Sequence, residues 1–99
     1  MKKFQASAPI PVHPGEILRE MLEDRGLSQS KLARHLKMDA SKINEICRRR
    51  RGISAEMALI LAKAFGTSAA LWLNLQKSWE LSQADPAVAG RIRPLKIGA

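Results

Sequence analysis

Cysteine and tyrosine are scarce in this chain, which has one cysteine, Cys47, and no tyrosine among its 99 residues. A single cysteine excludes an intrachain disulfide and a zinc site made of several cysteines, so we expect the reducing cytoplasm as its compartment. His13 and His35 lack the cysteine and carboxylate partners of a metal site. We therefore expect neither a metal nor any other cofactor.

Long apolar runs are also missing. The longest stretches, such as 57–62, fall far short of the roughly 20 residues that cross a bilayer. Prolines interrupt residues 1–15 where a signal peptide would have its apolar segment. We therefore expect a protein without a signal peptide and without a membrane partner.

Catalytic patterns are absent as well. The sequence contains no paired carboxylates, no nucleophile with a neighbouring base and no glycine-rich phosphate loop, so we expect no enzyme. What is present suits a binding domain: 45% of the residues are hydrophobic and 26% are charged, which is typical of a folded globular chain. The length allows one domain.

Acidic residues are outnumbered by basic ones, with 9 Asp plus Glu against 17 Lys plus Arg and a net charge of +8. This excess predicts a polyanionic partner, either nucleic acid or an anionic membrane surface. Residues 39–53 carry +3 and residues 91–99 carry +3, whereas residues 54–90 carry −1. Because the charge gathers in the middle and at the ends of the chain, nucleic acid is favoured over a membrane.

Apolar residues recur at helical spacing, and no segment alternates as a strand does. The pattern predicts an all-α fold of five helices that fades after residue 85. We assign residues 1–13 to an N-terminal arm, 14–81 to the domain, and 82–99 to a basic C-terminal tail that dimerises or is partly disordered. The predicted helix starts are Pro14, Ser28, Asp39, Ser54, and Thr67 or Ser68.

Two of these helices, 28–36 and 39–48, are separated by hardly any loop, which is typical of a helix-turn-helix motif. Gln29 opens the first helix, Ala33 is small where the two helices cross, and Ile43 faces inward from the second. These three positions resemble the pattern of the Cro/C1 type, the lambda repressor-like helix-turn-helix proteins.

A recognition helix of this kind contacts base edges with its N-terminal residues. Ala40, Ser41 and Asn44 point away from the buried face and are the predicted base contacts. Basic and polar residues around them are the predicted phosphate contacts, which give affinity more than sequence choice: Ser28, Gln29, Lys42, Arg48, Arg49, Arg50 and Arg51.

Two residues depart from the motif. The turn position favours positive φ and is commonly glycine, but here it is Lys37. Glu45 lies on the outward face, where it either accepts from a cytosine or pairs with a nearby arginine, and we favour the arginine. These departures leave open a protein-interaction module that has lost DNA binding.

The chain further resembles the HigA family of antitoxins over about residues 12–80. Its most specific motifs are 13–18, beginning His-Pro-Gly-Glu, and 71–76, Leu-Trp-Leu-Asn-Leu-Gln, accompanied by 26–29, 51–54 and 65–68. The resemblance implies a cytoplasmic homodimer that binds operator DNA. It also implies a partner, a HigB-type toxin, which is an mRNA-cleaving ribonuclease of the RelE superfamily.

A stand-alone repressor without a toxin remains the alternative. The fifth helix carries more apolar surface than four small helices need, so Trp72, Leu75 and Trp79 are predicted to serve core packing or dimerisation. Cys47 shares a face with Ile43 and is predicted to be a buried apolar residue.

Overall fold

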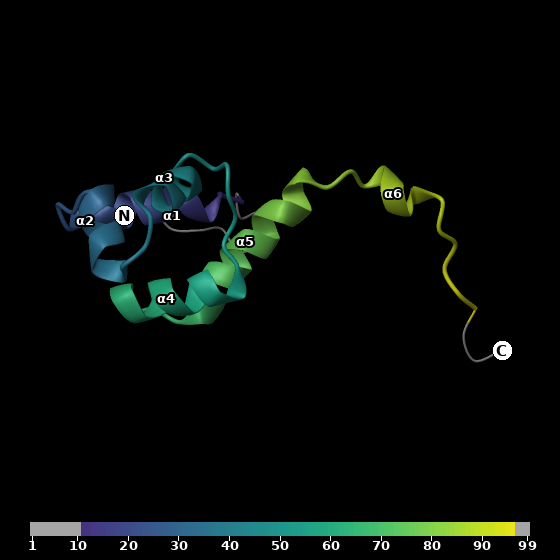
Figure 1. The fold of residues 1–99 in the computed structure, drawn as a ribbon. Coiled ribbons are helices and arrows are strands. Elements are labelled where there is room, and N and C mark those ends of the chain that lie inside the picture. The colour runs from purple at the N-terminus through teal and green to yellow at the C-terminus, as the bar shows by residue number, and fades with distance from the viewer. Residues whose placement is uncertain (1–10, 97–99) are drawn as a thin grey trace.

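A computed structural model of the chain describes residues 11–96 and contains only helices and turns in that range (Figure 1). The five predicted helices are present, and a short sixth follows them. The helices are α1 (Pro14–Asp24), α2 (Gln29–Leu36), α3 (Ala40–Cys47), α4 (Ala55–Phe65), α5 (Ala69–Gln83) and α6 (Ala87–Gly90). Residues 1–10 of the predicted arm and 97–99 of the predicted tail lie outside the described residues.

Serine hydroxyls fix the starts of three helices. Ser28, Ser54 and Ser68 each accept a backbone N–H three residues onward at 3.1 Å. Each such cap stabilises a helix by about 1 kcal/mol. The start predicted at Thr67 or Ser68 is therefore Ser68, whereas Asp39 precedes α3 without a side-chain cap bond.

The core lies where the five helices α1 to α5 meet, and Trp72 of α5 is its largest side chain. Trp72 has no exposed surface, and its indole N–H donates to Thr67 Oγ1 at 2.9 Å. Of the two roles predicted for Trp72, core packing or dimerisation, the structure supports core packing, because the ring is enclosed by its own chain and has no surface left for a partner copy. Cys47 is buried as predicted.

Glycine 15 allows α1 to begin directly against the end of α3. A Cβ atom on Gly15 would lie 1.8 Å from the carbonyl oxygen of Ile46 and 3.0 Å from His13 Nδ1. Only a residue without a side chain fits this backbone approach. Gly15 therefore holds the first helix and the predicted recognition helix together.

His13 caps the same end of α1 from the inside of the protein. Its Nδ1 accepts the Gly15 N–H at 2.9 Å, and its ring meets Trp79 edge-on with centroids 4.8 Å apart. Burial, and next the nearby Arg49 charge, lower the pKa of His13, while Glu16 opposes them. The neutral ring is the form that can accept at Nδ1.

The end of α5 and the tail leave the helical body (Figure 1). Every residue of 80–96 is exposed, and α6 lies well away from the other helices. The apolar residues there are Leu81, Val88, Ile92 and Leu95, between 71% and 84% exposed. No helix within residues 11–96 is long and apolar enough to span a membrane.

We expect Gly15→Ala to lower the free energy of unfolding by about 3 kcal/mol, the upper part of the range for overpacking. The added methyl group must push α1 away from the Ile46 carbonyl. Gly90→Ala is the control, because a Cβ there meets nothing within 4 Å. Chemical denaturation at one protein concentration measures both, and equal stability of the two variants would contradict the close approach.

We expect the free energy of unfolding to fall as pH drops below 6.5, the ordinary pKa of His13. The folded pKa is lower, so the unfolded chain takes up the proton first, and the loss continues until pH reaches the folded value. His13→Asn keeps a capping side chain that does not titrate. Its denaturation curves should show a flatter pH dependence in this window; an unchanged slope would contradict the assignment.

Candidate nucleic-acid interface

The turn between α2 and α3 adopts the geometry that the motif requires. Lys37 has φ 59° and ψ 47°, the left-handed conformation. Met38 N–H then donates to the Ala33 carbonyl at 3.0 Å and closes the end of α2. A side chain in this conformation costs about 1–2 kcal/mol relative to an ordinary helix residue, which the packing on both sides of the turn offsets.

The outward face of α3 carries the predicted base contacts. Ala40 and Ser41 are exposed in its first turn, and Asn44 is half-buried one turn later. Asn44 Nδ2 donates to Gln29 Oε1 at 3.1 Å, so the start of α2 is tied to the middle of α3. This contact leaves Asn44 Oδ1 and the Gln29 amide N–H groups for a ligand.

The remaining predicted phosphate contacts fall into two groups. Ser28 and Lys42 are exposed, and Ser28 also serves as the α2 cap. The four arginines begin the segment 48–53, which we call the arginine loop. Glu45 pairs with Arg51 at 2.8 Å, as predicted, and Arg49 pairs with Glu16 at 3.2 Å.

Arg48 and Arg50 therefore differ from their neighbours. Both are exposed, and no carboxylate of residues 11–96 pairs with either. Arg49 has φ 64°, and this left-handed conformation accompanies the turn of its side chain toward α1. The loop thus offers two unpaired guanidinium groups to an anion and uses the other two in its own structure.

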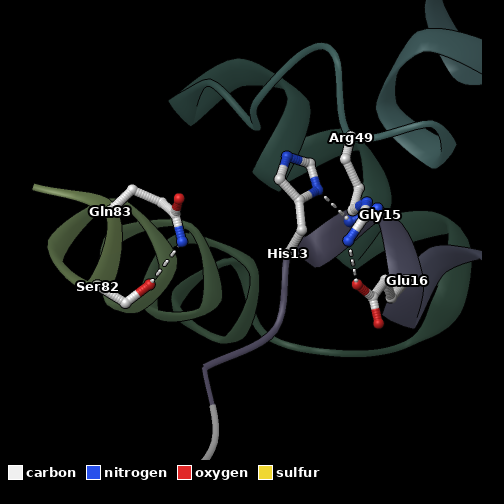
Figure 2. A network of polar contacts seen from close by, with 6 residues as sticks. All are labelled: His13, Gly15, Glu16, Arg49, Ser82 and Gln83. Atoms are coloured by element: carbon white, nitrogen blue, oxygen red, sulfur yellow. Dashed lines mark hydrogen bonds and ion pairs between the residues drawn. The ribbon is translucent and has the colours of Figure 1, made fainter.

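Figure 2 shows how Arg49 ties the arginine loop to α1. Its guanidinium reaches the Glu16 carboxylate just beyond the bond between His13 and Gly15. The ion pair is half-exposed, so its own contribution is below about 1 kcal/mol. The sequence motif His-Pro-Gly-Glu marks this cluster, but residue spacing does not indicate a partner 33 positions away.

A second contact ties the other end of the arginine loop to α5. Gln76 Oε1 accepts the Ile53 backbone N–H at 2.7 Å, and Gln76 Nε2 donates to Glu80 Oε2 at 2.8 Å. The hydrogen bond from Gln76, followed by one from Lys77, lowers the pKa of Glu80. Neither Gln76 nor Glu80 was predicted as a site residue.

Of the remaining predicted residues, Leu75 and Trp79 are half-buried on α5, and Trp79 packs against His13. Burial raises the pKa of the Cys47 thiol, which keeps it protonated at neutral pH. Cys47 therefore contributes packing. No group of three or more His, Cys, Asp and Glu side chains within residues 11–96 is arranged to hold a metal ion.

Comparison with known proteins identifies the architecture. A family model described as a helix-turn-helix domain matches residues 15–74. Virulence-associated protein I of Dichelobacter nodosus is 49% identical over 75 residues, which are 75% of this chain and 69% of that protein. The E. coli K12 protein YddM, described as an HTH-type transcriptional regulator, is 32% identical over 83% of this chain and 88% of its own.

Two solved structures are similar in both sequence and fold. Pseudomonas aeruginosa antitoxin HigA, solved with the higBA promoter, is 46% identical with a TM-score of 0.79, covering 88% of this chain and 100% of that one. An addiction module antidote protein of the HigA family from Coxiella burnetii is 37% identical with a TM-score of 0.77, covering 86% and 98%. With the five-helix body and the helix-turn-helix geometry above, these matches show that the chain belongs to the helix-turn-helix proteins and, among them, to the HigA family of antitoxins.

Proposed function

We propose that this chain is a dimeric, sequence-specific DNA-binding antitoxin that represses its own operon and neutralises a HigB-type toxin. The observation that carries the DNA-binding part is the surface of α3, where exposed Ser41 lies near the Asn44–Gln29 pair and the unpaired Arg48 and Arg50 follow. HigA of P. aeruginosa, solved with promoter DNA, supports the same use of this fold.

In this proposal, one set of residues gives the DNA-sequence specificity and another set gives the affinity. Asn44 can bond an adenine edge, Ser41 can donate or accept, and the Ala40 methyl group can touch a thymine methyl, each good contact giving about 1–3 kcal/mol of discrimination. The phosphate backbone is held by Ser28 and Gln29 where α2 begins, by Lys42, and by the unpaired Arg48 and Arg50. Arg49 and Arg51 contribute less, because each is already paired with a carboxylate.

Glu45 and Lys37, the two departures from the motif, do not weigh against DNA binding. Glu45 is neutralised by Arg51 and so presents less charge to a phosphate. Lys37 takes the left-handed conformation that glycine commonly takes there. The described residues give no further support to the alternative of a protein-interaction module that has lost DNA binding.

Dimerisation is assigned in this proposal to the second half of α5 and the segment that follows it. The half-buried Leu75 and Trp79, and the exposed Leu81, Val88, Ile92 and Leu95 beyond them, supply the apolar area that a partner copy would cover. We assign residues 14–81 to the DNA-binding domain, 1–13 to an N-terminal arm, and 82–99 to a basic tail that supports association together with the end of α5.

We expect Asn44→Ala to reduce the ratio of operator to random-DNA affinity by about 5- to 100-fold, the loss of one good base contact. Fluorescence anisotropy at physiological salt measures both affinities. Ser30→Ala is the control, because Ser30 is exposed on α2 and makes no side-chain hydrogen bond among the described residues. If the wild-type protein bound its upstream DNA no better than random DNA, the proposal of sequence-specific DNA binding would be contradicted.

We expect Arg50→Gln to weaken operator and random DNA by the same factor and to flatten the dependence of affinity on salt by about one counterion. Arg50 is unpaired and can neutralise a phosphate. The double variant Arg51→Gln with Glu45→Gln is the matched comparison, because it removes a paired arginine together with its carboxylate and leaves the net charge unchanged. Its effect should be smaller, and equal effects of the two variants would contradict this division of the arginines.

We expect this chain to abolish the growth arrest caused by a small ribonuclease encoded beside it, because an antitoxin masks its toxin by direct binding. Co-expression and copurification of the two proteins measure the effect. DNA binding without any such partner would instead identify a stand-alone repressor.

A further inference from the structure

Gln76 is a buried polar residue of α5 with two hydrogen-bond partners. One partner belongs to the arginine loop, and the other is a side chain of α5 that orients the Gln76 amide. The Gln76 side chain is 5% exposed, and Trp72, one turn earlier, is the other buried residue of α5. Burying an amide is unfavourable unless its hydrogen bonds are made, and both ends of this one are satisfied. The backbone group that it accepts from belongs to Ile53, at the end of the arginine loop.

Glu80 determines which way the Gln76 amide points. A carboxylate can only accept, so Gln76 Nε2 faces Glu80, and Oε1 is left to face the Ile53 N–H. Lys77 donates to the other oxygen of Glu80 at 3.4 Å and holds the carboxylate on this side of α5. The three side chains form one chain of contacts that ends on the loop backbone.

The absence of a side chain at Gly52 lets the loop backbone approach the Gln76 amide closely. A Cβ atom there would lie 2.7 Å from Gln76 Nε2, 2.8 Å from Oε1 and 2.9 Å from Cδ. The Gln76 amide is bonded on both sides, so it cannot move aside without losing a hydrogen bond. The loop backbone therefore passes directly over the amide, and only glycine allows this approach.

We propose that Gln76 is a positioning residue for DNA binding: by holding Ile53 and Gly52, it sets where α5 places the arginine loop and thus where Arg48 and Arg50 meet the phosphates. Arg49 with Glu16 fixes the other side of the loop on α1. The inference rests on the proposed DNA binding of this chain. It adds a residue that contacts no DNA and yet controls affinity.

The direct test is Gln76→Met, which keeps the volume of the side chain and removes both hydrogen bonds. We expect operator and random DNA to be bound about 3- to 10-fold more weakly by a common factor, with a flatter salt dependence, because the loop no longer holds its arginines in place. The discrimination between the two DNAs should stay as in the wild type. The Ile53 amide should exchange its hydrogen faster.

Thr67→Val is the control for stability alone. It removes the Trp72 indole bond at the start of α5, and it touches neither the loop nor the DNA-facing surface. We expect it to lower thermal stability without changing the salt dependence of DNA binding. If it changed binding as Gln76→Met does, loss of stability would explain both results, and the positioning role would be overturned.

A charge exchange keeps the inference testable if Gln76→Met fails to fold. Gln76→Glu places two carboxylates together and should weaken DNA binding. Adding Glu80→Gln restores a donor and an acceptor between the two positions and returns the net charge to that of the wild type, so binding should recover to within about twofold. No recovery in the double variant would overturn the positioning role.

Failure of this inference differs from failure of the proposed function. If the wild-type protein does not prefer its operator, DNA-binding repression is wrong, whatever Gln76 does. If the wild type prefers its operator but Gln76→Met binds every DNA as the wild type does, with an unchanged salt dependence, only the positioning role is wrong.

Discussion

The contact between Gly15 and the Ile46 carbonyl is the constraint on which the proposed DNA-binding surface depends. It brings the start of α1 against the end of α3, at the point where the recognition helix gives way to the arginine loop. His13 then reaches Trp79 of α5, and Glu16 reaches Arg49 of the loop. One backbone approach thus places three other elements around the C-terminal end of α3.

This arrangement changes the meaning of the net charge of +8. Two of the four consecutive arginines, Arg49 and Arg51, are neutralised by carboxylates, while Arg48 and Arg50 stay unpaired among residues 11–96. The charge available for phosphates in the loop is therefore about half of what composition suggests. The affinity for DNA then depends on the position of the arginine loop. The uncharged outward face of α3 determines which DNA sequence is bound.

Local patterns in the sequence predicted the helices well, because caps and turns depend on neighbouring residues. Ser28, Ser54 and the left-handed Lys37 are confirmed in this way. The contacts that place the arginine loop join residues 23 and 33 positions apart, and no spacing rule indicates them. Periodicity left Trp72 between core packing and dimerisation, because it shows which face of a helix is apolar and cannot show that the chain itself covers that face.

The central claim is that α3 selects a DNA sequence while the loop arginines hold the backbone. Hydroxyl-radical footprinting of the DNA upstream of this gene, with the purified full-length protein at physiological salt, tests it most directly. The account predicts two protected half-sites of a palindrome, separated by about one helical turn or a multiple of it. Uniform protection without half-sites, or protection no stronger than on random DNA, would contradict it.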